Sequence, residues 1–254
     1  PSYSDFSEEE SDEEDIDSPL PTPPHLPQRK WLWRRFETLV LSGAGVRGIS
    51  TLGAIHYCDT HKMLNIHTYI GTSSGAIICY LLAIGYTPIE IICYLCTHDI
   101  LNRLDTSNIS RAVAGDGFYD FEAFDLELER MTLEKVGYIL TLDQLHKKFN
   151  KYLIITTYND TKTKGEYIDY KSHPNLSCIT AIRMSCTIPL IFNKFKLLGN
   201  YYLDGGFFNN FPIEKAIKGS YTLGIETNAK KTSICKEDSS FFDYVYNILN
   251  TLFK

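Results

Sequence analysis

Short apolar runs alternate with segments of helical periodicity along the chain from residue 37 onward. Apolar runs of strand length occupy 37–42, 67–71, 151–158, 195–203 and 221–226. Apolar positions recur at helical spacing over 48–60, 75–85, 88–100, 120–132, 141–149, 176–186 and 239–253. Strands that alternate with helices are typical of β-α-β units around a largely parallel sheet. The pattern therefore predicts an α/β fold, and Thr141 with Gln144 predicts a capping box at the start of the fifth helix.

The N-terminal 28 residues have a different composition. They carry nine acidic side chains, no Lys or Arg, and a proline-rich run from Pro19 to Pro27. Such a segment buries too little apolar surface to offset the loss of chain entropy on folding. We expect a disordered tail over 1–28, a linker over 29–36, a folded domain over 37–228, and a C-terminal extension with an amphipathic helix over 229–254.

Charge and cysteine content narrow the class of protein. The chain has 25 Lys and Arg and 31 Asp and Glu, so without the nine acidic residues of the tail its net charge is about +3. Nucleic-acid-binding domains usually concentrate basic residues on one face, so this class is excluded. The seven cysteines lie mostly in apolar segments, as buried thiols do in a reducing compartment, and we expect Cys93 and Cys96 to pack in the core. No secretory signal opens the sequence, so we expect a cytoplasmic protein.

The pentapeptide Gly71-Thr72-Ser73-Ser74-Gly75 lies between a predicted strand and an apolar predicted helix. This context is required for a nucleophile elbow, in which a sharp turn exposes the central serine. The glycines Gly71 and Gly75 leave room for that turn, and the helix N-terminus provides a positive dipole. The alternative is a small-residue turn in which a serine caps the helix.

A second glycine-rich segment, Gly43-Ala44-Gly45-Val46-Arg47-Gly48, also follows an apolar strand and opens a helix. Its spacing is compatible with a dinucleotide-binding loop, but that fold needs an acidic residue about twenty positions later, and none lies there. Alternatively, the backbone N–H groups of the loop form an oxyanion hole. A third motif, Asp204-Gly205-Gly206, follows the run 195–203, at the end of a predicted strand where α/β sites gather.

These three motifs in this order resemble the patatin-like phospholipase family. Further stretches resemble it as well: Gly117-Phe118-Tyr119-Asp120, Thr141-Leu142-Asp143-Gln144-Leu145, Ala181-Ile182-Arg183-Met184-Ser185-Cys186-Thr187-Ile188-Pro189 and Asn210-Phe211-Pro212. The resemblance covers residues 37 to about 228. It implies a three-layer α/β/α sandwich around a mainly parallel sheet.

The resemblance also implies a chemistry. A dyad of Ser73 and Asp204 without histidine would cleave fatty-acyl esters of glycerophospholipids, with no metal or cofactor. The glycine loop from Gly43 to Gly48 would form the oxyanion hole, with donors from Gly45, Val46 and Arg47. Arg47 or Arg183 would contact a lipid phosphate, unless it forms an ordinary structural ion pair. The partner would be a lipid substrate at a membrane or lipid-droplet surface.

Three alternatives compete with this hypothesis. A Ser-His-Asp hydrolase would place its histidine last in the chain, yet the last histidine, His173, precedes Asp204. A second alternative is an esterase or a lipase for neutral acylglycerols, because pocket shape rather than motif decides the lipid. The third is a catalytically silent lipid-binding module, because a fold alone does not prove activity.

Overall fold

The computed structural model describes residues 35–98 and 121–227. Several predictions lie outside these residues: the tail over 1–28, most of the linker over 29–36, the motif over 117–120, and the extension over 229–254 with its helix over 239–253.

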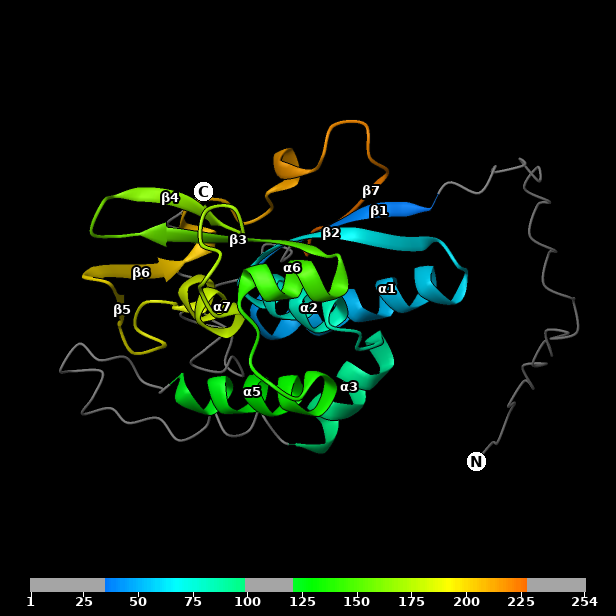
Figure 1. The fold of residues 1–254 in the computed structure, drawn as a ribbon, viewed down its shortest axis with the longest axis horizontal. Coiled ribbons are helices and arrows are strands. Elements are labelled where there is room, and N and C mark those ends of the chain that lie inside the picture. The colour runs from blue at the N-terminus through cyan, green and yellow to red at the C-terminus, as the bar shows by residue number, and fades with distance from the viewer. Residues whose placement is uncertain (1–34, 99–120, 228–254) are drawn as a thin grey trace, which may run out of the picture. The chain divides into compact units, whose positions relative to one another are not determined.

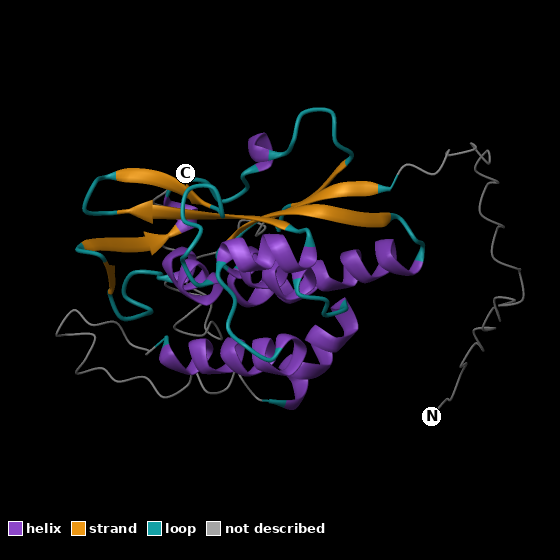
Figure 2. Ribbon diagram, viewed as in Figure 1, coloured by secondary structure: helices purple, strands orange, loops and turns teal. Residues whose placement is uncertain are grey.

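Seven strands form one sheet (Figures 1 and 2). Strands β1 (Phe36–Leu41), β2 (Leu64–Thr72), β3 (Tyr152–Asn159) and β7 (Thr222–Ile225) run parallel to one another. Strands β4 (Lys164–Ile168), β5 (Phe195–Leu197) and β6 (Asn200–Asp204) pair in antiparallel fashion. The order is β5-β6-β3-β2-β1-β7, with β4 also paired to β3. The predicted α/β fold with a mainly parallel sheet is confirmed.

The helices cover one face of this sheet in two layers (Figure 1). The inner layer consists of α1 (Ile49–Thr60), α2 (Ser74–Ala83), α6 (Leu142–Phe149) and α7 (Cys178–Cys186). The outer layer consists of α3 (Pro88–Thr97) and α5 (Glu122–Val136). The predicted capping box begins α6, where the backbone N–H of Gln144 donates to Thr141 Oγ1 and that of Thr141 to Gln144 Oε1.

Both faces of the central strands are buried, which explains their continuous apolar runs. On β1, Leu39 and Leu41 face the helices, whereas Val40 joins Ile70 and Ile154 in a smaller cluster on the other face. Within the described residues, that other face is covered by part of the segment 205–221, through Phe211 and Ala216. This segment contains the short 3₁₀ turns Gly205–Phe207 and Ile213–Lys215.

Three sequence predictions were wrong in detail. The apolar run 195–203 is not one strand but a hairpin of β5 and β6, because Leu198 and Gly199 both adopt positive φ and reverse the chain. Strand β4 was not predicted, because its sequence Lys-Gly-Glu-Tyr-Ile is polar, as suits an edge strand. Cys93 and Cys96 are exposed rather than packed in the core, because α3 turns Ile91 and Tyr94 inward instead.

Among the described residues, no single helix is long and apolar enough to cross a membrane. Helices α2 and α3 meet that criterion only when they are taken together, and they are bent by 120° relative to each other.

Candidate active site

The carboxyl ends of β2 and β6 meet on the same edge of β3. Strand β2 pairs with β3 in parallel as far as the pair Thr72 and Thr156. Strand β6 then pairs with β3 in the opposite direction, starting at the very next residue with the pair Thr157 and Asp204. Strand β4 pairs with β3 over 155–159 and therefore takes the other edge. The residue after β2, Ser73, and the last residue of β6, Asp204, are thereby placed side by side.

Ser73 lies in a sharp turn between β2 and α2. Its backbone has φ 53° and ψ −126°, a conformation that is uncommon for any residue with a side chain. A Cβ on Gly71 would lie 2.6 Å from Ala76 N, and one on Gly75 would lie 2.6 Å from Ser42 O, so both flanking positions require glycine. The Ser73 side chain makes no capping hydrogen bond to α2. This is the geometry of a nucleophile elbow rather than of a helix cap.

The Asp204 carboxylate is buried beside Ser73. Its Oδ1 accepts a hydrogen bond from the N–H of Gly206 at 2.7 Å, while its backbone N–H donates to Thr187 O. Its Oδ2 makes no well-formed hydrogen bond with a described residue, and the Ser73 hydroxyl is close enough to act on the carboxylate. Burial raises the pKa of this carboxyl to about 6, although the Ser73 hydroxyl and the Gly206 N–H both act to lower it.

The glycine loop lies against the elbow, and two side chains hold it there. Asn210 Nδ2 donates to Gly43 O at 3.0 Å, and the N–H of Gly43 donates back to Asn210 O. The N–H of Ala44 donates to Ser74 Oγ at 3.1 Å.

Within the loop, the backbone N–H groups differ in whether they donate inside the 3₁₀ turn. The N–H of Arg47 donates to Ala44 O. Residues Gly45 to Gly48 form a 3₁₀ turn, and the first N–H groups of a helical turn have no partner within it. The amides of Gly45 and Val46 open this turn, and both residues line the cavity beside Ser73.

Ser73 opens into an apolar cavity of about 140 Å³. The cavity lies between the sheet-facing helices and the outer layer, and its apolar walls come from α1, α2, α3, α5 and the segment that follows α7 (Leu52, Ile78, Leu81, Ile91, Leu95, Leu128, Met131, Ile188). Glu127 is the one charged side chain among the described lining residues. Such a wall suits a hydrocarbon chain, because it offers burial without hydrogen-bond partners.

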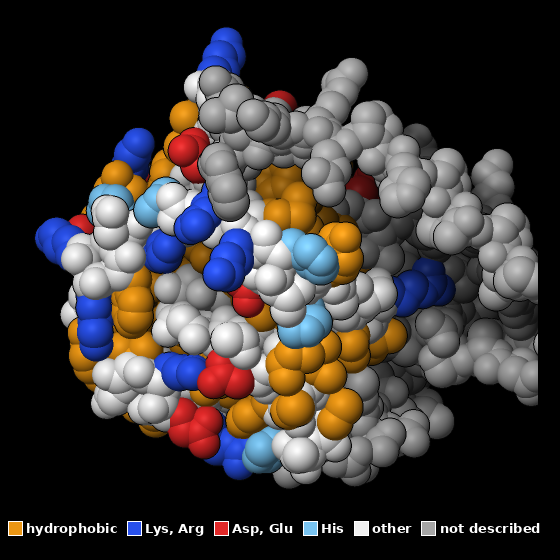
Figure 3. All heavy atoms as spheres, turned by 90° about the vertical axis from the view of Figure 1, so that its right-hand side faces the viewer, with side chains coloured by type: hydrophobic (Ala, Val, Ile, Leu, Met, Phe, Trp, Pro, Cys, Tyr) orange, Lys and Arg blue, Asp and Glu red, His pale blue; other side chains and the backbone are white. Residues whose placement is uncertain are grey.

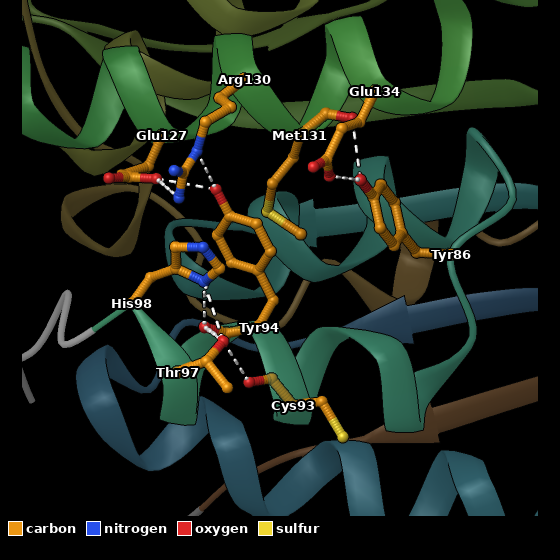
Figure 4. A network of polar contacts seen from close by, with 9 residues as sticks. All are labelled: Tyr86, Cys93, Tyr94, Thr97, His98, Glu127, Arg130, Met131 and Glu134. Carbon is orange, nitrogen blue, oxygen red and sulfur yellow. Dashed lines mark hydrogen bonds and ion pairs between the residues drawn. The ribbon is translucent and has the colours of Figure 1, made fainter.

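A polar network holds α3 against α5 at the outer wall of this cavity (Figure 4). The hydroxyl of Tyr94 donates to Glu127 Oε2 and accepts a hydrogen bond from Arg130 Nε, both at 2.7 Å. Arg130 Nη2 forms an ion pair with the same carboxylate oxygen at 2.7 Å. A second tyrosine, Tyr86, donates to Met131 O at 2.9 Å. The network satisfies the polar groups next to the cavity, so Glu127 is paired rather than isolated.

The two arginines named as phosphate contacts have different surroundings. Arg183 Nη1 pairs with Asp125 Oδ2 at 2.6 Å, and its guanidinium lies 4.8 Å from the centre of the Phe195 ring. Arg47 follows the two loop amides in the same 3₁₀ turn and is half-buried. Among the described residues, no group of three or more His, Cys, Asp or Glu side chains is arranged to hold a metal ion.

Four residues at this site belong to motifs quoted from the sequence, but their roles were not predicted. Ser74 and Asn210 hold the glycine loop, as described above, and Ser185 Oγ accepts the N–H of Ser73 at 2.8 Å. Cys186 is buried next to Ser73, and burial together with the charge of Asp204 raises the pKa of its thiol. All of these contacts join distant parts of the chain, so local patterns could not reveal them.

Comparison with known proteins identifies the family of this chain. The family model described as patatin-like phospholipase matches residues 39–217, well over half of the chain. The chain belongs to the patatin-like phospholipase family. The family predicted from the three motifs is thus confirmed, and its class is that of lipid acyl hydrolases.

The chain also resembles individual proteins of viruses and bacteria. A probable lipid hydrolase of Invertebrate iridescent virus 6, 463L, is 39% identical over 72% of this chain, which spans 64% of that protein. An uncharacterized protein of Acanthamoeba polyphaga mimivirus, R571, is 28% identical over 84% of this chain and 75% of its own length. The crystal structure of VipD from Legionella pneumophila matches with a TM-score of 0.52 and 19% identity, over 76% of this chain and 50% of that one. The last likeness shows a shared fold.

Proposed function

We propose that this protein is a metal-independent acyl hydrolase that cleaves fatty-acyl esters of glycerophospholipids. The observation that carries the proposal is the position of Ser73. It sits on an elbow at the mouth of an apolar cavity, beside a buried carboxylate whose Oδ2 has no other partner among the described residues. An acyl chain in the cavity would bring its ester carbonyl next to Ser73.

The reaction follows from these contacts. Ser73 Oγ attacks the ester carbonyl and its proton moves to Asp204 Oδ2, while the N–H groups of Gly45 and Val46 bind the oxyanion. The tetrahedral intermediate then collapses to an acyl-enzyme, and the proton on Asp204 passes to the departing lysolipid alkoxide. Water gives a proton to Asp204 as it attacks the acyl-enzyme. Release of the fatty acid returns that proton to Ser73.

The environment of Asp204 supports its role as the base. An ordinary aspartate has a pKa near 3.9 and is a weak base toward a serine hydroxyl. A pKa of about 6 strengthens the base yet leaves it ionised at neutral pH. Because a carboxylate remains a modest base, the oxyanion donors and the dipole of α2 must supply much of the stabilisation of the transition state.

The apolar cavity favours a lipid over a small polar ester as the natural substrate. We propose phospholipid rather than neutral acylglycerol as the substrate because Arg47 follows the two oxyanion amides in the same turn, where its side chain could pair with a head-group phosphate. Such a lipid resides in an aggregate, so the protein would act as a peripheral enzyme at a membrane or lipid-droplet surface of the cytoplasm.

Purified protein tests this proposal with phosphatidylcholine vesicles in the presence of a chelator. We expect release of free fatty acid that is lost in Ser73→Ala and in Asp204→Ala, and retained in Ser172→Ala, which removes an exposed serine far from the elbow in sequence. A fluorophosphonate probe should label wild type and Ser172→Ala but not Ser73→Ala. Full activity in Ser73→Ala would refute the mechanism. Absence of both turnover and labelling in wild type would favour the silent lipid-binding module.

A further inference from the structure

Two turns of the sheet lie next to each other at the carboxyl end of β3, on the side of the molecule away from helices α1 and α3 (Figure 1). The first joins β3 to β4 over 160–163, and the second is the β5–β6 turn at Leu198 and Gly199. The N–H of Asp160 donates to Tyr201 O at 3.0 Å, and the N–H of Tyr201 donates to Thr161 Oγ1 at 2.8 Å. These bonds make the two turns one structural unit.

The β5–β6 turn contains an exposed leucine, Leu198, at a position where a small polar residue is usual. Leu198 is 93% exposed, more than any other large hydrophobic residue described. Its φ is +47° and that of Gly199 is +84°, the signs of a two-residue turn in which Asn-Gly is the usual sequence. The leucine therefore gains no burial and adopts a backbone conformation that Asn would accept more readily. Nothing within the described residues accounts for this choice.

Exposed lysines lie on or beside both turns. Lys162 and Lys164 come from the first turn, and Lys196 lies two residues before Leu198; all three are exposed, and none forms an ion pair with a described residue. The first turn also carries one exposed acidic residue, Asp160. Tyr201 lies among the lysines, 41% exposed, with Lys196 Nζ 5.1 Å from its ring centre. The opposite end of the molecule shows acidic, basic and histidine side chains among hydrophobic ones (Figure 3).

We propose that this lysine-leucine tip, formed by Lys162, Lys164, Lys196, Leu198 and Tyr201, docks the protein on an anionic lipid bilayer. Leu198 would enter the boundary of the acyl chains, Tyr201 would lie at the head groups, and the lysines would pair with lipid phosphates. A protein partner is disfavoured because the cores of protein interfaces are well packed and depleted in charged residues, whereas this tip is one exposed apolar side chain with lysines on both neighbouring turns.

Docking at this place would serve the proposed function, on which the inference rests. Strand β6 starts at Asn200 beside the tip and ends at Asp204, four residues later, a span of about 13 Å. An anchor at one end of β6 thus holds the catalytic carboxylate at a fixed distance from the lipid that supplies the substrate.

The test measures vesicle binding separately from turnover. In the Ser73→Ala background, which leaves lipid intact, co-sedimentation with phosphatidylcholine vesicles containing phosphatidylserine should exceed that with phosphatidylcholine alone and should weaken at high salt. Leu198→Asn should lower the partition coefficient about tenfold without lowering Tm, because Asn fits the turn. The double variant Lys162→Glu with Lys196→Glu should lower it at least 25-fold, at about fivefold for each lysine. Leu133→Gln, which removes a leucine that is 48% exposed on α5, should bind like the parent.

The outcomes separate this inference from the proposed function. With Ser73 intact, Leu198→Asn should hydrolyse a soluble butyrate ester at the wild-type rate and lose activity only on vesicles. The inference would be overturned if Leu198→Asn bound vesicles as strongly as the parent. It would also be overturned if binding by the parent depended neither on salt nor on the head group. If wild type hydrolyses neither substrate yet the tip variants lose binding, the proposed function fails and the docking surface stands.

Discussion

Replacing Asp204 by Asn should abolish activity and at the same time stabilise the protein. Asn keeps the acceptor that receives the Gly206 N–H, and it places a neutral amide where the buried Oδ2 now makes no well-formed hydrogen bond with a described residue. The variant therefore removes a buried negative charge with little change in shape. Catalytic groups that are held in unfavourable surroundings often limit stability in this way.

The magnitude follows from the raised pKa. Burial moves the pKa of Asp204 from 3.8 to about 6, and each unit corresponds to about 1.4 kcal/mol, so the ionised carboxylate destabilises the fold by up to about 3 kcal/mol. Because the pKa is higher in the folded state, this penalty is absent below about pH 4 and complete above about pH 6. Asp204→Asn should therefore raise Tm by up to about 10 °C at pH 8, and the gain should shrink toward zero at pH 4.

Urea and thermal unfolding at pH 4, 6 and 8 measure this difference. Asp160→Asn, which neutralises an exposed aspartate in the β3–β4 turn, should change stability by less than about 0.5 kcal/mol at each pH. A variant Asp204→Asn that is less stable than wild type at pH 8, or whose gain does not depend on pH, would refute the argument that burial sets the pKa.

Further predictions concern catalysis. Hydrolysis of a soluble ester in a pH-stat should lose about tenfold in kcat/KM for each pH unit below 6, because protonated Asp204 cannot accept the serine proton; a flat profile would exclude it as the base. Ser74→Ala removes the acceptor of the Ala44 N–H and should lower kcat about tenfold with little change in KM, less than the loss of an oxyanion donor itself. Leu128→Phe narrows the cavity, whose volume is comparable to that of a cavity that holds a benzene ring. In a series of p-nitrophenyl esters, this variant should lower kcat/KM for long acyl chains about tenfold more than kcat/KM for butyrate.

Local features of the site could be predicted because their determinants are adjacent in sequence. A strand, a glycine, a serine, a second glycine and an apolar helix specify the elbow at Ser73, since steric crowding in a tight turn acts over a few residues. The capping box at Thr141 was predictable for the same reason, because its two hydrogen bonds span three residues.

Elements whose signals conflict could not be predicted. The sequence over 195–203 predicts one strand because Leu198 occupies a turn position where Asn or Asp is usual, so no turn signal interrupts the apolar run. Strand β4 lacks an apolar alternation because it lies at an edge and pairs on one side only with β3. Tertiary requirements override local propensity in both places.

The meeting of Ser73 with Asp204 depends on where β2 stops. The last residue of β2, Thr72, pairs with Thr156, and the next three residues of β3 on that edge are taken by β6. Had β2 continued for two more residues, it would have occupied the edge that β6 needs, and Asp204 would have no place beside the serine. The sharp turn at Ser73 therefore acts twice: it exposes the nucleophile, and it ends β2 in time for the strand that carries the carboxylate to pair.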